Sequence, residues 1–254
     1  MSGRVDPVVE RSHLELKRAV ILAGGVGSRL APYTLVFPKP LMPLGSTPIL
    51  EIVIRQLAAR GFDEVIVATG HLAELIETFF GNGEAFGISI RYVREQQPLG
   101  TAGALGLVTG LDEPFLVMNG DILTTLDYGV LIEEHASSGA DMTIATHRRE
   151  QLVDFGVIES DESLRVTGYV EKPRLHYNVS MGAYALSPGA LNFIESGERI
   201  DIPELVGRLL HADRPVRIHP FEGFWLDIGR HDDFARAQEE FEKRKNELLG
   251  LGPA

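Results

Sequence analysis

The stretch "AVILAGGVGSRLAPYTLVFPKPLMPLG", residues 19–45, runs from an apolar segment into a glycine-rich loop that contains one arginine and one lysine. Residues 18–23 fit a short buried strand. Glycines at positions 24, 25 and 27 allow the backbone to approach a ligand closely and to point successive N–H groups at it. The stretch therefore predicts a strand followed by an anion-binding loop, although a glycine turn that binds nothing is the simpler alternative.

The distribution of charge supports a local anion site in an acidic protein. The formal net charge is −12, which argues against nucleic acid or an acidic membrane as a partner over a broad surface. Residues 16–50 contain no Asp or Glu, whereas an even spread would place about five there. This acid-free window holds Lys17, Arg18, Arg29 and Lys39. We interpret it as a site kept for an anion; the alternative is a partly buried loop that lacks charge for that reason.

Composition limits the class of protein. The chain of 254 residues contains no cysteine, which excludes disulfides, thiolate chemistry and cysteine-ligated zinc and is compatible with a reducing cytoplasm, where we expect the protein to reside. No apolar run approaches the length of a membrane span, so no membrane association is expected. Residues 1–17 carry scattered charges and are interpreted as an N-terminal tail, not a secretory signal.

Strand and helix patterns alternate in the first 150 residues. Strand patterns cover residues 18–23, 62–70, 88–95, 114–120 and 140–148, and helix patterns cover residues 47–61, 71–83, 101–110 and 126–139. Helix 71–83 is expected to bury one face made of Leu72, Leu75, Ile76, Phe79 and Phe80. The alternation predicts an α/β fold with a mainly parallel sheet and helices on both faces.

The alternation ends near residue 150. Two adjacent strands at 155–161 and 165–172, a strand at 179–187, helices at 188–196 and 202–212, a strand at 215–221 and a helix at about 231–248 follow. No linker or repeat separates the halves. The second half is therefore expected to extend the same sheet within one domain, residues 18–250.

Residues that directly follow strands are candidates for a site, because ligands of open α/β sheets bind at the carboxyl ends of the strands. Asp121 ends the motif "NGD", Lys172 lies in "VEKP", and Asp227 lies in "FWLDIGR". Asp121 and Asp227 together would suit Mg²⁺, which prefers one or two carboxylates plus phosphate oxygens and water. Taken singly, the three fit an Asx turn, a surface lysine and a helix start.

In their order along the chain these motifs resemble the sugar-1-phosphate nucleotidylyltransferases, and most closely their mannose- and manno-heptose-1-phosphate guanylyltransferase branch. The resemblance covers roughly residues 18–240: the opening loop, then "EQQPLGTAGAL" at 95–105, "NGD", "EKP" and "WLDIG". It implies a three-layer, Rossmann-like fold with a mixed, mostly parallel sheet. It also implies a nucleotide-binding half (18–150), a sugar-phosphate-binding half (151–230) and a C-terminal helix (231–250).

The resemblance implies a reaction between a nucleoside triphosphate and a sugar 1-phosphate. The sugar phosphate attacks the α-phosphorus and pyrophosphate leaves. Asp121 and Asp227 would hold Mg²⁺, Arg29 the pyrophosphate, Lys39 the α-phosphoryl oxygens or the leaving group, and Lys172 the sugar phosphate. The implied nucleotide-binding residues are Leu22, Ala23, Gly24, Gly25, Gly27, Glu95, Gly100 and Thr101. The implied sugar-phosphate-binding residues are Asn119, Gly156, Glu171, Lys172, Ser180 and Gly182.

The base is predicted from Glu95, which takes the place of a glutamine in many uridylyl- and thymidylyltransferases. A carboxylate only accepts hydrogen bonds, and guanine offers two adjacent donors on its Watson–Crick edge. GTP is therefore favoured, whereas UTP, dTTP and CTP stay open because Gln96 could take the same place.

The sugar is less constrained by the sequence. Ser180-Met181-Gly182 stands where many relatives have Asn-Ala-Gly, so mannose, manno-heptose and glucose 1-phosphates all stay open, with the first two favoured. Three other functions are weighed: a metal-dependent glycosyltransferase, a cytidylyltransferase acting on a non-sugar phosphate, and a sensor of nucleotide sugars. A homo-oligomer is compatible with the sequence, and the chain is expected to be close to a minimal catalytic unit. His71, His135 and His231 are expected at the surface or at helix caps.

Overall fold

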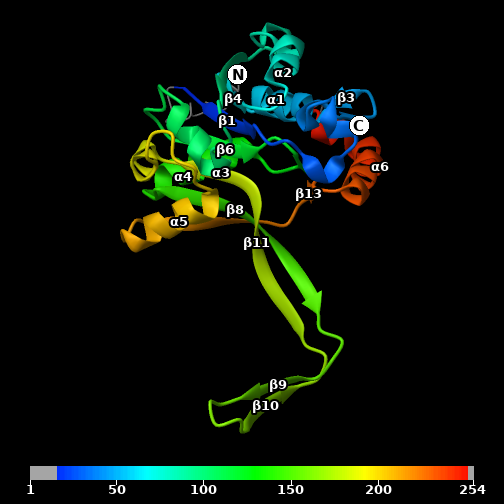
Figure 1. Cartoon of the computed structure of the whole chain (residues 1–254), viewed down its shortest axis with the longest axis vertical. Helices are drawn as coiled ribbons and strands as arrows, with labels where there is room; N and C mark the ends of the chain where they lie inside the picture. The colour runs from blue at the N-terminus through cyan, green and yellow to red at the C-terminus, as the bar shows by residue number, and fades with distance from the viewer. Residues whose placement is uncertain (1–15, 251–254) are drawn as a thin grey trace, which may run out of the picture.

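A seven-stranded mixed sheet forms the centre of the fold in the computed structural model, which describes residues 16–250 (Figure 1). The strand order is β12-β8-β11-β6-β1-β4-β5, and only β11 runs antiparallel to its neighbours. The bounds are β1 Arg18–Ala23, β4 Glu64–Thr69, β5 Ser89–Arg94, β6 Phe115–Asn119, β8 Met142–Leu152, β11 Arg174–Leu186 and β12 Val216–Phe221. The predicted mostly parallel sheet is confirmed. Most of the tail expected over residues 1–17 lies outside the described residues.

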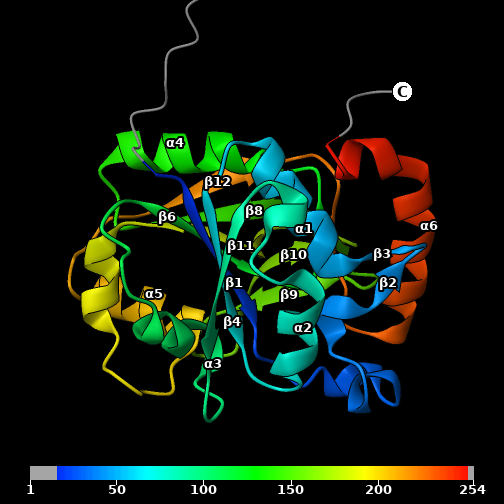
Figure 2. The same ribbon diagram turned by 90° about the horizontal axis from the view of Figure 1, so that it is seen from above.

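Helices cover both faces of this sheet, as Figure 2 shows from above. One face packs against α1 (Ile49–Ala59), α2 (Ala73–Phe80) and α4 (Tyr128–Ser138), and the other against α3 (Gly100–Gly103) and α5 (Ile202–His211). Alternate side chains of β1 explain the two cores: Ala19 and Ile21 enter the first, and Val20 enters the second. The three-layer expectation is confirmed.

The C-terminal helix α6 (His231–Leu248) forms a third core beside the sheet. Ala237, Phe241 and Leu248 are fully buried against Leu30 of the opening loop region, among others. The expected bounds of this helix are confirmed. No helix within residues 16–250 is long and apolar enough to cross a bilayer.

Two helical expectations need correction. In α2, Ile76 and Phe80 are buried, but Leu75 and Phe79 are 41% and 50% exposed, because the helix lies over the edge strand β5 where the sheet ends. The segment expected as a helix at 188–196 is a 3₁₀ helix, Pro188–Phe193.

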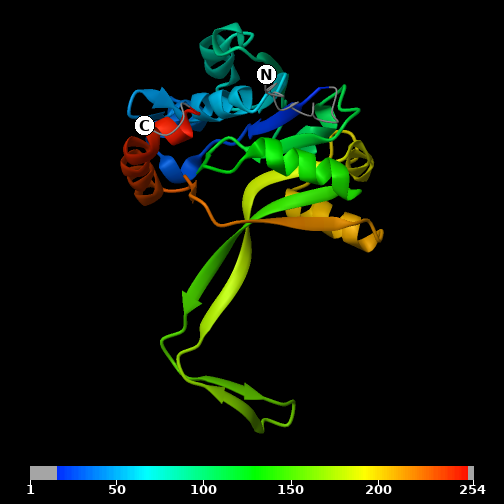
Figure 3. The ribbon, with the colours of Figure 1, turned by 180° about the vertical axis from the view of Figure 1, so that it is seen from behind.

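The second half of the chain extends the sheet only in part. Strands β8 and β11 are buried where they lie in the sheet and continue beyond it as an exposed two-stranded ribbon. The ribbon ends in a separate sheet of β9 (Val157–Ser160) and β10 (Val166–Val170), which pair in antiparallel fashion. We call residues 147–179 the arm; it stands clear of the body in Figures 1 and 3. The expectation of one continuous sheet is thus wrong for β9 and β10.

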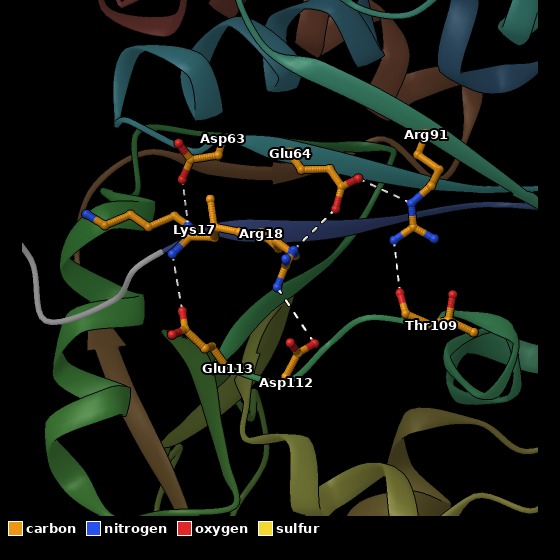
Figure 4. A network of polar contacts seen from close by, with 9 residues as sticks. Lys17, Arg18, Asp63, Glu64, Arg91, Thr109, Asp112 and Glu113 are labelled. Atoms are coloured by element: carbon orange, nitrogen blue, oxygen red, sulfur yellow. Dashed lines mark hydrogen bonds and ion pairs between the residues drawn. The ribbon is translucent and has the colours of Figure 1, made fainter.

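A polar network fixes the amino end of β1 to its neighbours (Figure 4). The Arg18 guanidinium lies 3.3 Å from Glu64, which also accepts a hydrogen bond from Arg91 at 3.2 Å. The Lys17 ammonium pairs with Glu133 at 2.7 Å. Lys17 and Arg18 therefore stabilise the end of β1 opposite the glycine loop, and our assignment of these two cations to an anion site is wrong.

His135 is a core residue, although a surface or cap position was expected. Its side chain is 1% exposed, with Nδ1 2.8 Å from Thr143 Oγ1 and Nε2 3.1 Å from Ser187 Oγ. Because Ser187 donates its own proton to the Ala140 carbonyl, the neutral imidazole must donate from Nε2 and accept at Nδ1. Burial lowers the pKa of His135 to about 4, and the charge of Asp141 opposes this shift only in part.

We predict that this histidine makes stability depend on pH. The unfolded chain takes up a proton at His135 near pH 6.5 and the folded chain only near 4, so stability is complete above pH 6.5 and decreases as the pH falls between these values. The full loss amounts to roughly 3 kcal/mol. Urea unfolding at pH 7.5 and 5 should show a smaller pH effect in His135→Gln than in the wild type, while the exposed control His211→Gln keeps it. An equal pH effect in His135→Gln would contradict this assignment.

Candidate active site

A cleft of about 370 Å³ lies at the carboxyl ends of β1 and β6. It is where the rule for open α/β sheets places a ligand. The cleft brings together the whole predicted nucleotide-binding set, both cations of the loop, and two residues at the end of β6, Asn119 in the strand and Asp121 just after it. These lining residues are Leu22, Ala23, Gly24, Gly25, Gly27, Arg29, Lys39, Glu95, Gly100, Thr101, Asn119 and Asp121.

Two glycines of the loop, Gly24 and Gly27, lie close to neighbouring side chains. A Cβ on Gly24 would lie 2.1 Å from a carboxylate oxygen of Glu95. Gly27 has φ +66°, and its carbonyl accepts a hydrogen bond of 2.8 Å from the Thr34 hydroxyl. The loop therefore passes close to Glu95 and turns sharply before Arg29, which leaves its backbone open to the cleft.

Lys39 and Asp121 form a buried ion pair at the floor of the cleft. The Lys39 ammonium donates a short hydrogen bond to Asp121 Oδ2, and the lysine side chain is 9% exposed. The second carboxylate oxygen, Asp121 Oδ1, is buried and has no hydrogen-bond partner among the described residues. A buried, unsatisfied carboxylate oxygen is costly, so its position indicates a ligand that compensates for it.

Asp227 is brought to this pair by strand pairing. Strand β13 (Trp225–Asp227) pairs in antiparallel fashion with β7 (Ile122–Thr124), so that Asp227 lies opposite Ile122. The Ile228 N–H donates to the Asp121 carbonyl at 3.0 Å. Burial and the neighbouring Asp121 charge raise the pKa of Asp227 above its usual range, which Lys39 and Arg29 counteract in part. Two carboxylates thus lie together against their mutual repulsion.

This donor set fits Mg²⁺. Within residues 16–250 no group of three or more His, Cys, Asp or Glu side chains could hold a metal, so the protein offers two carboxylates here. Mg²⁺ takes one or two carboxylates and completes its shell with substrate phosphates and water. The unsatisfied Asp121 Oδ1 and the raised pKa of Asp227 are the features that a cation would relieve.

Beside the cleft, a second cavity of about 400 Å³ shares Gly24 and Glu95 with it. Its wall adds His71, whose Nε2 is buried without a hydrogen-bond partner among the described residues, together with Gln96 and Gln97. The sequence analysis expected His71 at the surface or at a helix cap and did not place it in the wall of a cavity. The position of Gly70-His71 directly after β4 was the available signal.

Glu95 joins the two cavities. One of its oxygens accepts the Leu99 N–H at 2.9 Å, and the other lies against Gly24. Burial raises the pKa of its carboxyl, and the Leu99 hydrogen bond opposes that shift. Glu95 is therefore a fixed acceptor pointing at the space between the cavities.

Thr101 is positioned by a residue that the sequence did not single out. Its N–H and hydroxyl both bond to Asp201 Oδ1, at 2.8 and 3.1 Å, and the Ile202 N–H donates to the Thr101 hydroxyl at 2.9 Å. The link between Thr101 and Asp201 spans 100 residues, so no local pattern reveals it.

The predicted sugar-phosphate residues are divided between the body and the arm. Gly182, with φ +75°, approaches the cleft residue Asn119 so closely that a Cβ would lie 2.6 Å from Nδ2. Ser180 lies two residues away, and its hydroxyl donates to Tyr184 at 3.0 Å. These residues border the cleft.

The other three lie on the arm, and the structure does not bring them to the cleft. Glu171 accepts a hydrogen bond of 2.9 Å from Tyr169, next to Gly156. Lys172 is exposed in a left-handed conformation, with φ +45°. Their assignment to a sugar phosphate stays a prediction.

Comparison with known proteins adds a family and its relatives. A family model described as nucleotidyl transferase matches residues 18–244. The chain is 33% identical over 242 residues to mannose-1-phosphate guanylyltransferase from Mycobacterium tuberculosis, covering 93% of this chain and 66% of the relative. It is 32% identical over 240 residues to UTP–glucose-1-phosphate uridylyltransferase from Synechocystis, covering 87% and 62%. The chain thus spans slightly less than two thirds of the length of these relatives.

Two solved structures with the same fold match this chain over nearly their whole length. A putative glucose-1-phosphate thymidylyltransferase from Bacillus anthracis, in complex with sucrose, matches with a TM-score of 0.70 and 25% identity over 88% of this chain and 94% of that one. HddC from Yersinia pseudotuberculosis complexed with GMP-PN matches with a TM-score of 0.68 and 25% identity over 88% and 99%.

We predict opposite stability effects for the two aspartates in the absence of divalent metal. Asp227→Asn removes a charge that burial and Asp121 disfavour, so the melting temperature in EDTA should rise. Asp121→Asn leaves the buried Lys39 ammonium without its carboxylate and should destabilise the fold by roughly 2 kcal/mol or more. Thermal unfolding of both variants tests this; a decrease of equal size in both would contradict the charge arrangement.

Proposed function

The chain belongs to the nucleotidyl transferase family, and from that premise we propose that it is a sugar-1-phosphate nucleotidylyltransferase. It joins a nucleoside triphosphate to a sugar 1-phosphate and releases pyrophosphate. The observation that supports this proposal most directly is the cleft lined by a bare glycine loop, Arg29, Lys39 and Asp121, with the carboxylate of Asp227 close enough to feel the charges of all three side chains.

The chemistry needs positioning more than activation. A sugar phosphate is already an anion, so no serine, cysteine or histidine has to deprotonate it. The barrier lies in aligning two anions that repel each other and in stabilising the charge that builds on the α-phosphate. Preorganised cations and backbone N–H groups meet both needs because they do not reorganise during the reaction.

Each cleft group has a distinct task. The N–H groups of the glycine loop bind the triphosphate, and Arg29 binds the phosphates that leave as pyrophosphate. Lys39 neutralises charge at the α-phosphate while Asp121 orients its ammonium. Lys172, supplied by the arm, binds the incoming sugar phosphate.

Asp121 and Asp227 are the residues that would hold Mg²⁺. When bound there, the ion supplies positive charge against the phosphate oxygens of the nucleotide. The protein holds the two carboxylates in place through the β7–β13 pairing before any ligand arrives.

We propose GTP and mannose 1-phosphate, or a manno-heptose 1-phosphate, as substrates. Glu95 presents an oxygen that can accept the two donors of guanine, next to His71 in the adjoining cavity. The relative from Mycobacterium tuberculosis is named for guanylyl transfer to mannose 1-phosphate, and the ligand named with the Yersinia pseudotuberculosis structure is GMP-PN. UTP and glucose 1-phosphate are the second candidate pair, supported by the relative from Synechocystis.

We also propose that the protein works in the cytoplasm on small-molecule substrates alone. The absence of cysteine and the net charge of −12 support this location and the absence of nucleic-acid binding.

We predict that removal of the charged cleft groups abolishes turnover without unfolding the protein. Arg29→Ala, Asp121→Ala and Asp227→Ala should each lower kcat at least a hundredfold, since one such contact contributes about 3 kcal/mol in the transition state. Pyrophosphate release measures the rate. The control Arg55→Ala removes an exposed helix ion pair with Glu51 and should stay within about twofold of the wild type. Near-normal turnover in all three cleft variants would contradict the proposal.

We predict that Glu95 selects the base. In a competition among GTP, UTP, CTP and dTTP with one sugar phosphate at a time, GTP with a mannose-type sugar should react fastest. Glu95→Gln keeps the hydrogen bond from Leu99 but loses a charged acceptor, so the GTP:UTP ratio of kcat/KM should fall by about tenfold or more. Clear preference of the wild type for a pyrimidine nucleotide would overturn the guanine assignment.

A further inference from the structure

The arm exposes an apolar surface that a solitary chain leaves in water. Phe155 is 78% exposed and Leu164 is 85% exposed. A two-stranded sheet is marginally stable in water unless a face is covered. The large exposed apolar residues of the arm are Leu152, Phe155, Ile158, Leu164, Val166, Tyr169, Val170, Leu175 and Tyr177.

The arm does not reach the body of its own chain. The main packing partner of β9 is β10, and Figures 1 and 3 show both strands clear of the sheet from opposite sides. Strand β8 leaves the sheet without a break: it pairs with β12 as far as His147 and with β11 as far as Leu152. Five residues of strand extend roughly 16 Å, so the pairing of β8 with β11 holds the arm out beyond the edge of β12.

The arm carries groups that the cleft lacks. Cations lining the cleft are Arg29 and Lys39, and Lys39 is already paired with Asp121. Lys172 forms no ion pair with another described residue, and its left-handed backbone is costly for a residue with a side chain. Such conformations cluster at ligand-binding positions, so the arm is built to present this lysine to something.

A second exposed apolar surface borders the cleft. The segment between Gly25 and Lys39 exposes Val26, Tyr33, Leu35, Val36 and Phe37, with Val36 at 76%. Arg29, within this segment, and Lys39, at its end, line the cleft. A group that covers this segment therefore lies at the mouth of the cleft.

We propose that two copies of the chain exchange arms: the arm of one copy docks on residues 26–37 of the other and places Glu171 and Lys172 at its cleft. Exchange in both directions gives a two-fold dimer with two composite sites. The docking rests on the exposed apolar surfaces alone, whereas the task of Lys172 in the composite site rests on the proposed function.

The area involved is sufficient for a stable dimer. A buried aromatic side chain covers about 150–250 Å². At exposures of 78%, 61% and 47%, Phe155, Tyr169 and Tyr177 together offer roughly 300–450 Å² per copy. Counting the surface they meet, two arms would bury roughly 1,200–1,800 Å², which is within the range of stable, specific interfaces. A second copy is the occupant that supplies both the apolar segment and, next to it, a cleft that the arm can complete with Lys172.

Light scattering over a dilution series tests the docking. The wild type should be a dimer, and the triple variant Phe155→Ser, Ile158→Ser, Leu164→Ser should be a monomer. The matched control replaces three exposed apolar residues of the body, Val130→Ser, Leu210→Ser and Ile218→Ser, and should stay a dimer. A monomeric wild type, or a triple arm variant that still dimerises, would overturn the proposal.

Complementation tests the composite site. Chains with Lys172→Ala and chains with Asp121→Ala are co-expressed with two different tags, and the mixed dimer is purified through both. Each variant alone is expected to be inactive, whereas the mixed dimer should regain about half of wild-type turnover, because one of its two sites has an intact cleft and an intact arm. If each arm served its own chain, both sites would carry one defect and the mixed dimer would be inactive.

The two measurements separate this inference from the proposed function. Should the wild type turn over no combination of nucleotide and sugar phosphate, the proposed function fails while light scattering still decides the docking. An active wild type whose mixed dimer gains nothing would refute the exchange and leave the proposed function intact.

Discussion

Two carboxylates held side by side in a partly buried place are the constraint from which the rest of the site follows. Asp121 and Asp227 repel each other, and burial raises the pKa of Asp227. The fold keeps them together through the β7–β13 pairing and through the bond from Ile228 to the Asp121 backbone. Lys39 neutralises one carboxylate, and one oxygen of Asp121 stays unsatisfied. This arrangement lowers the stability of the ligand-free protein, and a positively charged ligand between the carboxylates would restore it.

The sheet and its helices could be predicted because their signals are local. Short continuous apolar runs indicated the buried strands of the first half, and helical spacing of apolar residues indicated α1 and α2. The errors occurred where the burial of a residue depends on its tertiary neighbours. The buried face of α2 is narrower than the apolar face predicted from its sequence, because Leu75 and Phe79 extend past the edge of the sheet. His135 was misassigned for the same reason, since burial depends on distant partners such as Ser187.

The site was predicted best where motif and strand end coincide. Every residue assigned to the nucleotide lines the cleft, because the rule for α/β sheets converts a position after a strand into a position in space. The support from Asp201 to Thr101 and the second cavity, around His71, depend on contacts between distant segments. Lys17 and Arg18 are the reverse case, close to the loop in sequence but distant from it in space. Strand β1 lies between them and the loop, and their side chains pair with acids at its amino end.

The arm explains why the sugar-phosphate residues resist prediction from one chain. The strands of the arm could be predicted from their sequence patterns. Their position relative to the body could not, because beyond the sheet they pair only with one another. The body holds the carboxylates and the glycine loop that suit a triphosphate, whereas the exposed Lys172 lies on the arm. In the proposed reaction the body binds the triphosphate and the arm binds the sugar phosphate, so neither part has to hold both anions alone. This division also makes the sugar-phosphate site depend on whatever surface the apolar arm covers.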